Sequence, residues 1–229
     1  MTARPCIPIE EFLGNVPLFA ALGHAELARL AKGAVLLDAP RGTSIFRRGD
    51  PCTGIHVIVS GQVKLVLHSS QGGEKVVELL GPGHSLGGPV LFLNRPHRVT
   101  AEALADTKLV HVPKSKVLAE LEHHVGFARR IIADLSHRLD YFISDLESVT
   151  LRSGTERVVG YLLNNVQVCP HDGAAVTLPA SKGIIASRLS LTQEHFSRIL
   201  HELAASGLIG VDGRDIRIPN LERLRARAV

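Results

Sequence analysis

The sequence predicts an α+β protein with an N-terminal antiparallel β-roll, a long central helix and a C-terminal winged helix-turn-helix. Three observations lead to this prediction. Short runs of alternating apolar residues punctuated by glycine fill residues 34–112, heptad-spaced apolar residues follow from Phe127, and a helix-turn-helix pattern with a hairpin signal lies near the end of the chain. We therefore divide the chain into residues 1–113, 114–151 and 152–229.

The 229-residue chain has the composition of an ordinary globular protein, with 45% hydrophobic and 21% charged residues, and its length favours two domains. It has no apolar run of the ~20 residues that cross a bilayer, and its start lacks the apolar core of a secretory signal. We therefore expect a cytoplasmic protein without a membrane partner. The cysteines Cys6, Cys52 and Cys169 are too widely spaced for a disulfide framework or a structural zinc site, so we expect reduced thiols.

Residues up to Lys32 are expected to form short helices that pack on the following domain. In the next segment two alternating apolar runs flank Ser60-Gly61, which predicts a β-hairpin. The runs consist of Ile55, Val57 and Val59 and of Val63, Leu65 and Leu67. Many short strands with glycine turns are typical of an antiparallel barrel or roll.

The central helix carries apolar residues at alternating spacings of three and four, which is the a/d pattern of a coiled-coil seam. These residues are Ile132, Leu135, Leu139, Phe142, Leu146 and Val149. The pattern favours pairing with the same helix of a second copy of the chain. The alternative is packing on the chain's own β domain, while Ile131 and Ile143 on a flanking face could serve that packing alongside a paired seam.

The helix breaks at residues 152–155, the candidate hinge, where Thr155 is suited to cap a helix over 156–165; a short strand over 175–178 follows. A further helix is expected to begin near Pro179 and to end at a tight turn, Ser190-Leu191. Thr192 then caps a second helix. Its inward apolar residues are Phe196, Ile199, Leu200 and Leu203.

The outward face of this second helix carries side chains that can read base edges in DNA. Arg198 can donate a bidentate pair to guanine, Glu194 can accept from cytosine, and both lie beside Ser197. The alternative is a solvated face with an ion pair between Glu194 and Arg198. An Asp-Gly hairpin signal at residues 211–214 completes a winged helix and favours DNA binding. The candidate DNA-contacting residues, phosphate contacts included, are Lys182, Ser187, Arg188, Thr192, Gln193, Glu194, Ser197, Arg198 and Arg214.

The charge distribution agrees with this interpretation. The chain has a formal net charge of +4, and the residues after Thr150 carry 10 Lys and Arg against 7 Asp and Glu. Most of the positive excess thus falls on the segment with the helix-turn-helix pattern, which suits a nucleic-acid partner.

The order of these parts resembles the cyclic-AMP receptor protein/FNR family of bacterial transcription regulators over nearly the whole chain. The most specific part begins at Glu194-His195-Phe196-Ser197-Arg198, which is similar to the ExxSR pattern of the FNR-like and denitrification-regulator branches. The resemblance implies a cyclic-nucleotide-binding-like sensor, a homodimer, TTGAT-type palindromes in double-stranded DNA, and an activating contact with RNA polymerase at residues 168–172. An effector would then act through the central helix and the hinge on the spacing of two recognition helices.

Departures from the family pattern bear on the effector. Cyclic-nucleotide-binding members carry a Gly-Glu turn and an Arg-Ser or Arg-Thr pair, whereas this chain has Gly87-Gly88-Pro89 and Arg98-Val99, which argues against cyclic AMP. Cys6 stands alone where FNR has a cysteine cluster, which argues against an iron–sulfur centre. Residues 91–96 and 136–139 resemble regulators linked to nitric oxide through haem, so haem is a candidate cofactor.

The resemblance singles out no haem ligand. Neutral imidazole can bind haem iron, and the histidines in or near the sensor domain are His56, His68, His84, His97 and His111. Cys169-Pro170 is a further candidate pair, which a simple turn explains as well. The candidate effector-pocket residues are Leu91, Leu93, His97 and Arg98. A regulator that responds to another small molecule, or to none, is the alternative.

A β-barrel metalloenzyme of the cupin type is the competing interpretation of the glycine-rich β region. Such enzymes need a compact cluster such as His-x-His followed by Glu. Here His56 and His68 lie far apart along the chain, and no His-x-His occurs. We expect no nucleophile in an esterase or P-loop setting either, and therefore no enzymatic activity.

Overall fold

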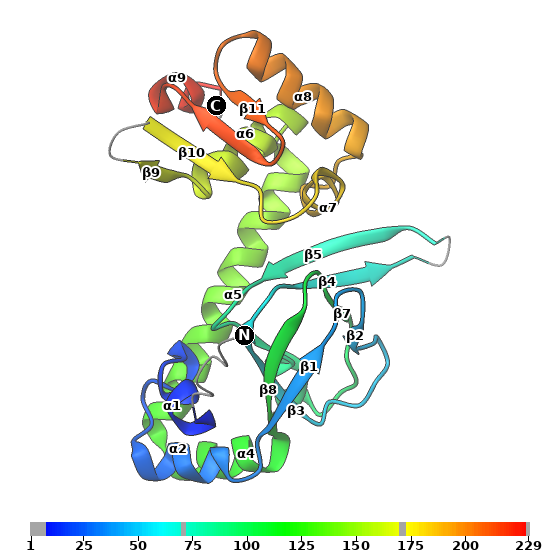
Figure 1. The fold of residues 1–229 in the computed structure, drawn as a ribbon. Helices are drawn as coiled ribbons and strands as arrows, with labels where there is room; N and C mark the ends of the chain where they lie inside the picture. Colours follow the sequence, from blue (N-terminus) through cyan, green and yellow to red (C-terminus); the bar gives the residue numbers. More distant parts are fainter. Residues whose placement is uncertain (1–7, 70–71, 170–172, 228–229) are drawn as a thin grey trace, which may run out of the picture. The chain divides into compact units, whose positions relative to one another are not determined.

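The computed structural model describes residues 8–69, 72–169 and 173–227. The chain divides into two compact units, one formed by residues 1–71 and 77–140 and the other by residues 72–76 and 141–229. The expected α+β architecture is confirmed: an N-terminal antiparallel β domain, a long helix and a C-terminal helix-turn-helix (Figure 1).

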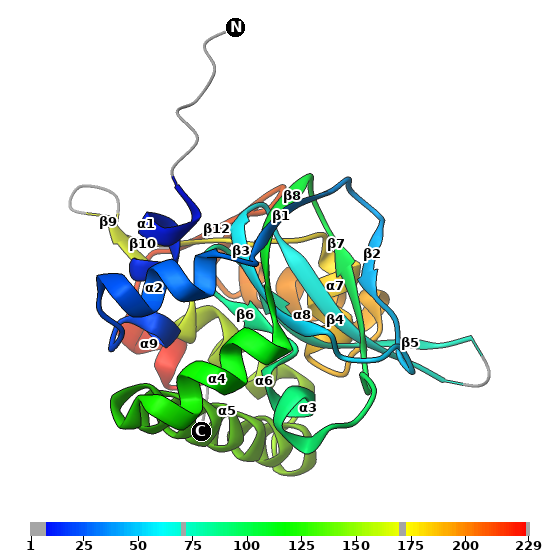
Figure 2. The same cartoon turned by 90° about the horizontal axis from the view of Figure 1, so that it is seen from below.

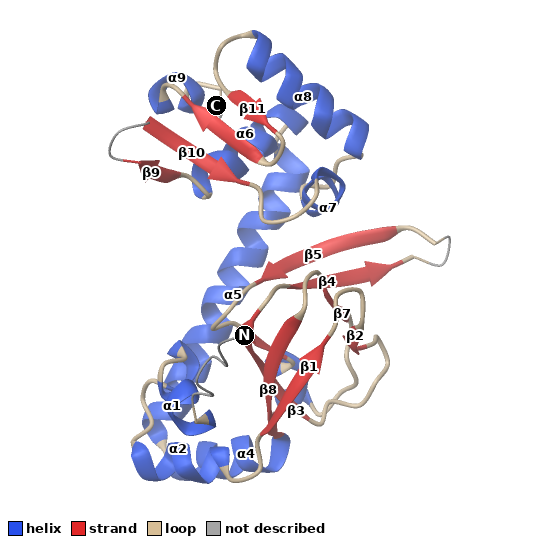
Figure 3. Cartoon of the chain, viewed as in Figure 1, coloured by secondary structure: helices blue, strands red, loops and turns tan. Residues whose placement is uncertain are grey.

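The first unit begins with short helices, as the sequence predicts, and continues into two four-stranded antiparallel sheets (Figure 3). The helices are α1 (Ile9–Gly14), the 3-10 helix η1 (Pro17–Phe19) and α2 (His24–Ala31). One sheet has the strand order β1-β8-β3-β6 and the other β2-β7-β4-β5. The strands are β1 (Val35–Ala39), β2 (Ser44–Phe46), β3 (Gly54–Ser60), β4 (Val63–His68), β5 (Glu74–Leu80), β6 (Ser85–Leu86), β7 (Thr100–Ala103) and β8 (Thr107–Pro113). The short helix α3 (Gly88–Leu93) follows β6.

The predicted hairpin between β3 and β4 is wrong, although both strands exist. β3 pairs with β8 and β6, whereas β4 pairs with β7 in the other sheet. Gly61 turns the chain from one sheet into the other with a φ of 91°, and a Cβ there would lie 2.4 Å from the hydroxyl oxygen of Thr107. The alternation also does not mark a strand with one buried face, since residues 54–58 of β3 are buried in succession. The choice of partner strand is a long-range property that a local period does not encode.

Two groups of buried apolar side chains hold this unit together. One group joins strands of both sheets and includes Phe46, Ile58 and Leu86. The other joins the N-terminal helices to β3, β8 and the start of α5 (Val125–Leu151), where Phe19 stacks on Phe127 with ring centroids 5.8 Å apart. The two groups take in the alternate apolar residues of β3 and β4 except Leu67, which is 39% exposed.

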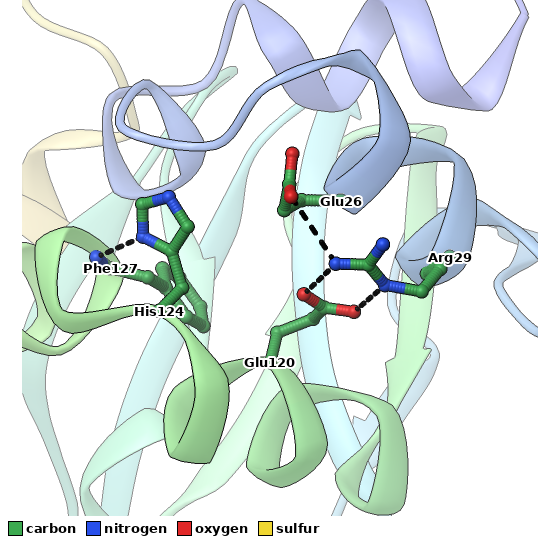
Figure 4. A network of polar contacts seen from close by, with 5 residues as sticks. All are labelled: Glu26, Arg29, Glu120, His124 and Phe127. Carbon is green, nitrogen blue, oxygen red and sulfur yellow. Dashed lines mark hydrogen bonds and ion pairs between the residues drawn. The ribbon is translucent and has the colours of Figure 1, made fainter.

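The segment expected as one helix over residues 114–151 consists of α4 (Lys114–His123) and α5 (Figure 2, both in green). His124 separates them in an extended conformation. Its Nδ1 accepts a hydrogen bond of 3.0 Å from the backbone N–H of Phe127, so the imidazole caps the start of α5 (Figure 4).

An ion pair joins α2 to α4 (Figure 4). Nε and Nη2 of Arg29 donate to the two carboxylate oxygens of Glu120 at 2.6 and 2.9 Å, and Nη2 also donates to Glu26 at 3.3 Å. The Glu120 residue is only 5% exposed. Because a buried carboxylate needs a partner, Arg29 stabilises the packing of α2 on α4.

The second unit contains α6 (Gly154–Asn164), α7 (Lys182–Arg188), α8 (Gln193–Ala205), α9 (Leu221–Arg225) and a four-stranded sheet of order β11-β12-β10-β9. Its strands are β9 (Gln167–Cys169), β10 (Gly173–Thr177), β11 (Gly210–Asp212) and β12 (Asp215–Ile218). The sequence predicts all of these elements except β9 and α9.

The break at residues 152–155 is present, but Ser153, not Thr155, caps α6. The Ser153 hydroxyl accepts from the backbone N–H of Glu156 at 3.3 Å, and the Glu156 carboxylate accepts from the N–H of Ser153 at 2.5 Å. This reciprocal capping box requires Glu three residues after the cap, a spacing that Ser153 has and Thr155 lacks.

Candidate nucleic-acid interface

The α7–turn–α8 segment has the geometry of a helix-turn-helix. Ser190 adopts the left-handed region with φ of 56°, and the N–H of Leu191 donates to the carbonyl of Ala186 at 2.9 Å, which closes the turn. The Thr192 hydroxyl accepts from the N–H of His195 at 3.2 Å, so the predicted cap is present. α7 starts three residues after Pro179, at Lys182, with Ser181 at the N-cap.

α8 separates its side chains by polarity. Its four inward apolar residues are buried, namely Phe196, Ile199, Leu200 and Leu203. On the opposite face Gln193, Glu194 and Arg198 are exposed, and Ser197 is partly exposed. Glu194 and Arg198 form no ion pair with each other in the described part of the chain, so the alternative of a paired, solvated face has no support here. The face presents both donor and acceptor groups of the kind that base edges bind.

The hairpin after α8 forms the predicted wing. β11 and β12 pair in antiparallel register, and Gly213 supplies the positive φ of 58° that the turn needs. Arg214 is exposed at the tip, while its carbonyl accepts from the N–H of Leu178 at 2.8 Å and fixes the wing to the sheet. Lys182 is half-buried at the start of α7.

Two of the candidate phosphate contacts on α7 make contacts within the unit. Arg188 is 8% exposed, and its Nη1 donates to Asp145 on α5 at 2.6 Å while Nη2 donates to the hydroxyl of Tyr141. Burial lowers the pKa of Arg188, but the hydrogen bonds to Tyr141 and Asp145 outweigh it and leave the pKa raised. The Ser187 hydroxyl is bonded to the backbone of residues 74 and 76.

The seam residues of α5 present a row of exposed apolar side chains. Ile132, Leu139 and Leu146 are 63%, 62% and 64% exposed. Phe142 is 40% exposed, and Leu135 and Val149 are half-buried. Of the two flanking residues expected to pack on the β domain, Ile131 is buried, but Ile143 is 57% exposed, because it lies beyond the part of α5 that the β domain covers.

The candidate effector residues differ in exposure: two are buried and two are exposed. Leu91 is buried in the core and His97 is 4% exposed, stacked on Phe46 with ring centroids 3.7 Å apart. Leu93 is 59% exposed and Arg98 is exposed as well.

Three imidazoles do lie near one another in the first unit. His56 and His111 are cross-strand partners on β3 and β8, with ring centroids 4.7 Å apart. The centroid of the Phe46 ring lies 5.9 Å from that of His56 and 3.7 Å from that of His97. Burial, with smaller contributions from His111 and His97, lowers the pKa of His56 to about 3, and burial also lowers the pKa of His97 and of His111. Nδ1 of His56 has no hydrogen-bond partner in the described structure.

The described residues contain no group of three or more His, Cys, Asp and Glu side chains arranged to hold a metal ion. His68 and His84 are exposed, and Nδ1 of His84 contacts the carbonyl oxygen of Gly81 at 3.1 Å. Cys52 is a free thiol whose Sγ lies 3.5 Å from the carbonyl oxygen of Gly54. Residues 170–172, Pro170 included, lie outside the described residues.

The expectation that no nucleophile stands in an esterase-type sequence is wrong at one place, because Gly83-His84-Ser85-Leu86-Gly87 has the Gly-x-Ser-x-Gly spacing of serine esterases. In an esterase the serine lies at a sharp turn after a strand, where its hydroxyl is exposed. Here Ser85 lies within β6, pairs with Val57 and is only 8% exposed. The positive φ values fall at Gly83 and Gly87, two residues before and after Ser85, and not at Ser85 itself. Ser85 is therefore not in the position of an esterase nucleophile.

None of the helices in the described ranges combines the length and the apolarity that a bilayer crossing requires. Sequence reasoning missed Tyr141, Asp145 and Lys75 as partners of α7. No local pattern marks them, because each contact joins residues more than 40 positions apart.

Comparison with known proteins agrees with this geometry. Residues 36–124 match the family model of the cyclic nucleotide-binding domain, and residues 156–227 match that of the Crp-like helix-turn-helix domain. Fold and interface together define a DNA-binding transcription regulator with an N-terminal domain of the cyclic-nucleotide-binding type. The chain belongs to the Crp/FNR family.

Several members are similar over most of their length. The CRP-like cAMP-activated global transcriptional regulator of Mycobacterium tuberculosis is 24% identical, with 96% of this chain and 100% of that protein covered. The structure of FixK2 from Bradyrhizobium japonicum is similar with a TM-score of 0.76 at 26% identity, covering 86% of this chain and 98% of that chain. DNR from Pseudomonas aeruginosa gives a TM-score of 0.52 at 30% identity, covering 99% and 100%.

Proposed function

We propose that the protein is a homodimeric regulator that binds palindromic DNA of the TTGAT type through the outward face of α8. In this proposal residues 1–113 sense an effector, 114–151 dimerise and 152–229 bind DNA in the cytoplasm. The observation that carries the proposal is the exposed polar face of α8. Gln193, Glu194 and Arg198 lie on this face, and the opposite, apolar face of the helix is buried. Such a face fits the major groove, where Arg reads guanine and Glu accepts from cytosine.

Homodimerisation is supported by the exposed seam of α5. Ile132, Leu139 and Leu146 are each more than 60% exposed. Burial of one such side chain stabilises an interface by roughly 1.5–3 kcal/mol, and a twofold pairing of α5 would bury each of them twice. Two recognition helices about 34 Å apart then match successive major grooves on one face of a duplex.

The test compares two duplexes of equal length and base composition, one with a TTGAT-type palindrome and one with the same bases scrambled. Fluorescence anisotropy at fixed salt measures the affinity of the purified protein for each, and sedimentation velocity measures its mass. We expect a dimer that prefers the palindrome by about 1000-fold or more. A monomer, or equal affinities for the two duplexes, would contradict the proposal.

For the effector we propose haem, through which a diatomic gas such as nitric oxide would be sensed. Iron binds neutral imidazole, and burial keeps His56, His97 and His111 neutral, as their lowered pKa values require. Nδ1 of His56, which has no hydrogen-bond partner in the described structure, is a nitrogen atom of the kind that can bind haem iron. These residues therefore fit haem in the chemistry of their donor atoms. A bound haem iron would supply the gas-binding position.

Cyclic AMP is a poorer fit to this chain. Gly88 replaces the family's carboxylate, and Val99, which replaces its hydroxyl, packs against the apolar cluster of the two sheets. A phosphate would keep only Arg98 of the family's partners. A regulator that needs another ligand, or none, is the alternative proposal.

A titration with haem tests the effector proposal. We expect a Soret band that saturates at one haem per chain and shifts with nitric oxide or carbon monoxide, and we expect His56→Ala to change its position. A parallel titration with cyclic AMP should leave DNA affinity unchanged. Absence of the Soret band would contradict the haem proposal and favour a regulator that needs another ligand or none.

We also propose that residues 168–172 contact RNA polymerase in activation, a suggestion that rests on family resemblance.

A further inference from the structure

Lys75 makes a set of contacts that the proposed function does not use. It belongs to the second unit through the short segment 72–76. Its Nζ donates to the carbonyl oxygens of Ser187 and Arg188 at 2.7 and 2.9 Å and contacts the hydroxyl of Ser190 at 2.7 Å. These carbonyls are at the C-terminal end of α7, where a helix has unpaired acceptors and partial negative charge. The lysine therefore acts as a charged C-cap for α7.

The backbone on either side of Lys75 strengthens this contact. The N–H of Val76 donates to the Ser187 hydroxyl at 2.9 Å, and that hydroxyl donates to the carbonyl of Glu74 at 3.2 Å. Among the described strands β5 is the last of its sheet, so one of its edges faces no other described strand. Ser187 thus satisfies two backbone groups on a strand edge, as a neighbouring strand would.

These contacts involve one of the candidate phosphate contacts on α7, Ser187. In a helix-turn-helix the first helix crosses the phosphate backbone while the second reads bases. Ser187 is one of the candidate phosphate contacts, and its hydroxyl already has a donor and an acceptor. The carbonyls that Lys75 caps and the turn at Ser190 lie beside it.

We propose that residues 74–76 form a clasp on α7 that keeps the helix-turn-helix from its full contact with DNA, and that the clasp opens when the protein binds a duplex. This inference rests on the proposed DNA-binding function. Residue 76 continues directly into residues 77–80 of the first unit, which belong to the same strand, β5. A rearrangement of the sheet β2-β7-β4-β5 is therefore transmitted to the clasp through β5.

The contacts of Lys75 stabilise the closed clasp only modestly. Burial of its amino group lowers the pKa of Lys75 to about 8, with Arg188 adding to the effect, while Asp145 opposes it. Removing the charged amine from water offsets much of what its hydrogen bonds contribute. A modest change at the sensor can therefore shift the balance between closed and open clasp.

The test is the affinity of effector-free Lys75→Met for the palindromic and the scrambled duplex. Loss of a positive charge by itself weakens binding to DNA. An open clasp has the opposite effect, and because it acts through phosphate contacts it applies to both duplexes. We expect an increase of about five- to tenfold for each. Ser190→Gly removes one acceptor and suits the positive φ of 56°, and should give a smaller increase.

Lys108→Met is the matched control, because it removes the same charge from β8. Among the contacts described, the amino group of Lys108 forms an ion pair only with the exposed Asp38. It should bind as the parent does or slightly more weakly. Equal or lower affinity of both Lys75→Met and Ser190→Gly relative to the parent, with the dimer intact, would overturn the clasp. Failure of the proposed function is distinguishable from failure of the clasp. In that case the parent protein would bind the palindromic and the scrambled duplex with equal affinity, whether or not Lys75→Met changes that affinity.

Discussion

Arg188 on α7 donates a 2.6 Å hydrogen bond to the carboxylate of Asp145 on α5, and its guanidinium carbon lies 5.4 Å from the centre of the Tyr141 ring. The first helix of the helix-turn-helix is thereby fixed to the end of the long helix that carries the proposed dimer seam. The ion pair is largely shielded, with 9% of the arginine side chain and 29% of the aspartate side chain exposed.

Arg188→Ala should destabilise the second unit by about 1–3 kcal/mol, because it leaves the Asp145 carboxylate without its partner in a partly buried place. Chemical denaturation followed by circular dichroism measures the change. Arg225→Ala is the control: it removes an exposed arginine whose ion pair is with Glu222, 60% and 79% exposed. Equal losses for the two variants would show that Arg188 is not a structural link.

Arg198→Ala should weaken binding to the palindrome by about 1–3 kcal/mol and relax the preference at one base pair of each half-site. The reason is that an exposed arginine at this position of α8 is free to donate two hydrogen bonds to one guanine. Anisotropy titrations against duplexes with single base changes measure both effects. If the variant keeps the parent's affinity and preference at every position, the reading face lies elsewhere. Arg225→Ala again serves as the control for loss of charge alone.

The elements that could be predicted from the sequence are those whose signals are local. Thr192, the apolar residues at helical spacing after it and the Asp-Gly turn at Asp212-Gly213 all act within a few residues, and α8 and the wing formed as expected. The cap of α6 shows the limit of such reasoning. Thr155 and Ser153 are both good cap residues, and the side chain of Glu156 decided in favour of Ser153.

The features that could not be predicted depend on contacts between distant residues. β3 and β4 follow each other in the chain, yet they lie in different sheets. Tertiary packing buries His97 against Phe46 and binds Arg188 to Asp145. Both contacts join residues 40 or more positions apart in the sequence. Sequence chemistry therefore predicts which side chains carry groups suited to DNA, but not which of those groups already have partners in the fold.

Leu139→Glu should convert the dimer into a monomer. Leu139 is 62% exposed at the middle of the seam, and its replacement sets two carboxylates against each other in the proposed interface. We expect the dimer dissociation constant to rise at least about 100-fold, with a matching loss of palindrome binding, in sedimentation equilibrium and anisotropy measurements. Ser144→Glu adds the same charge to an exposed position of α5 outside the seam and should leave the dimer intact. A dimeric Leu139→Glu would assign dimerisation to another surface.

The stability of the first unit should fall in mild acid because of His56. Its pKa is about 3 in the folded protein, against 6.5 for an ordinary histidine, so the unfolded chain binds the proton more readily. Stability is therefore full above pH 6.5 and is lost as the pH falls from 6.5 toward 3. Between pH 7.5 and pH 5 the loss from this one group is about 2 kcal/mol.

The groups that face His56 contribute in the same direction. His111 lies across the strand pair and His97 lies beyond the Phe46 ring, and burial lowers the pKa of both. His56→Phe removes only the largest contribution, so urea unfolding of this variant should show a pH dependence smaller by about 2 kcal/mol between pH 7.5 and pH 5. His84→Gln, at an exposed position, is the control and should follow the parent. If His56→Phe loses as much stability in acid as the parent does, the imidazole is protonated in the fold and a partner for its charge must be sought.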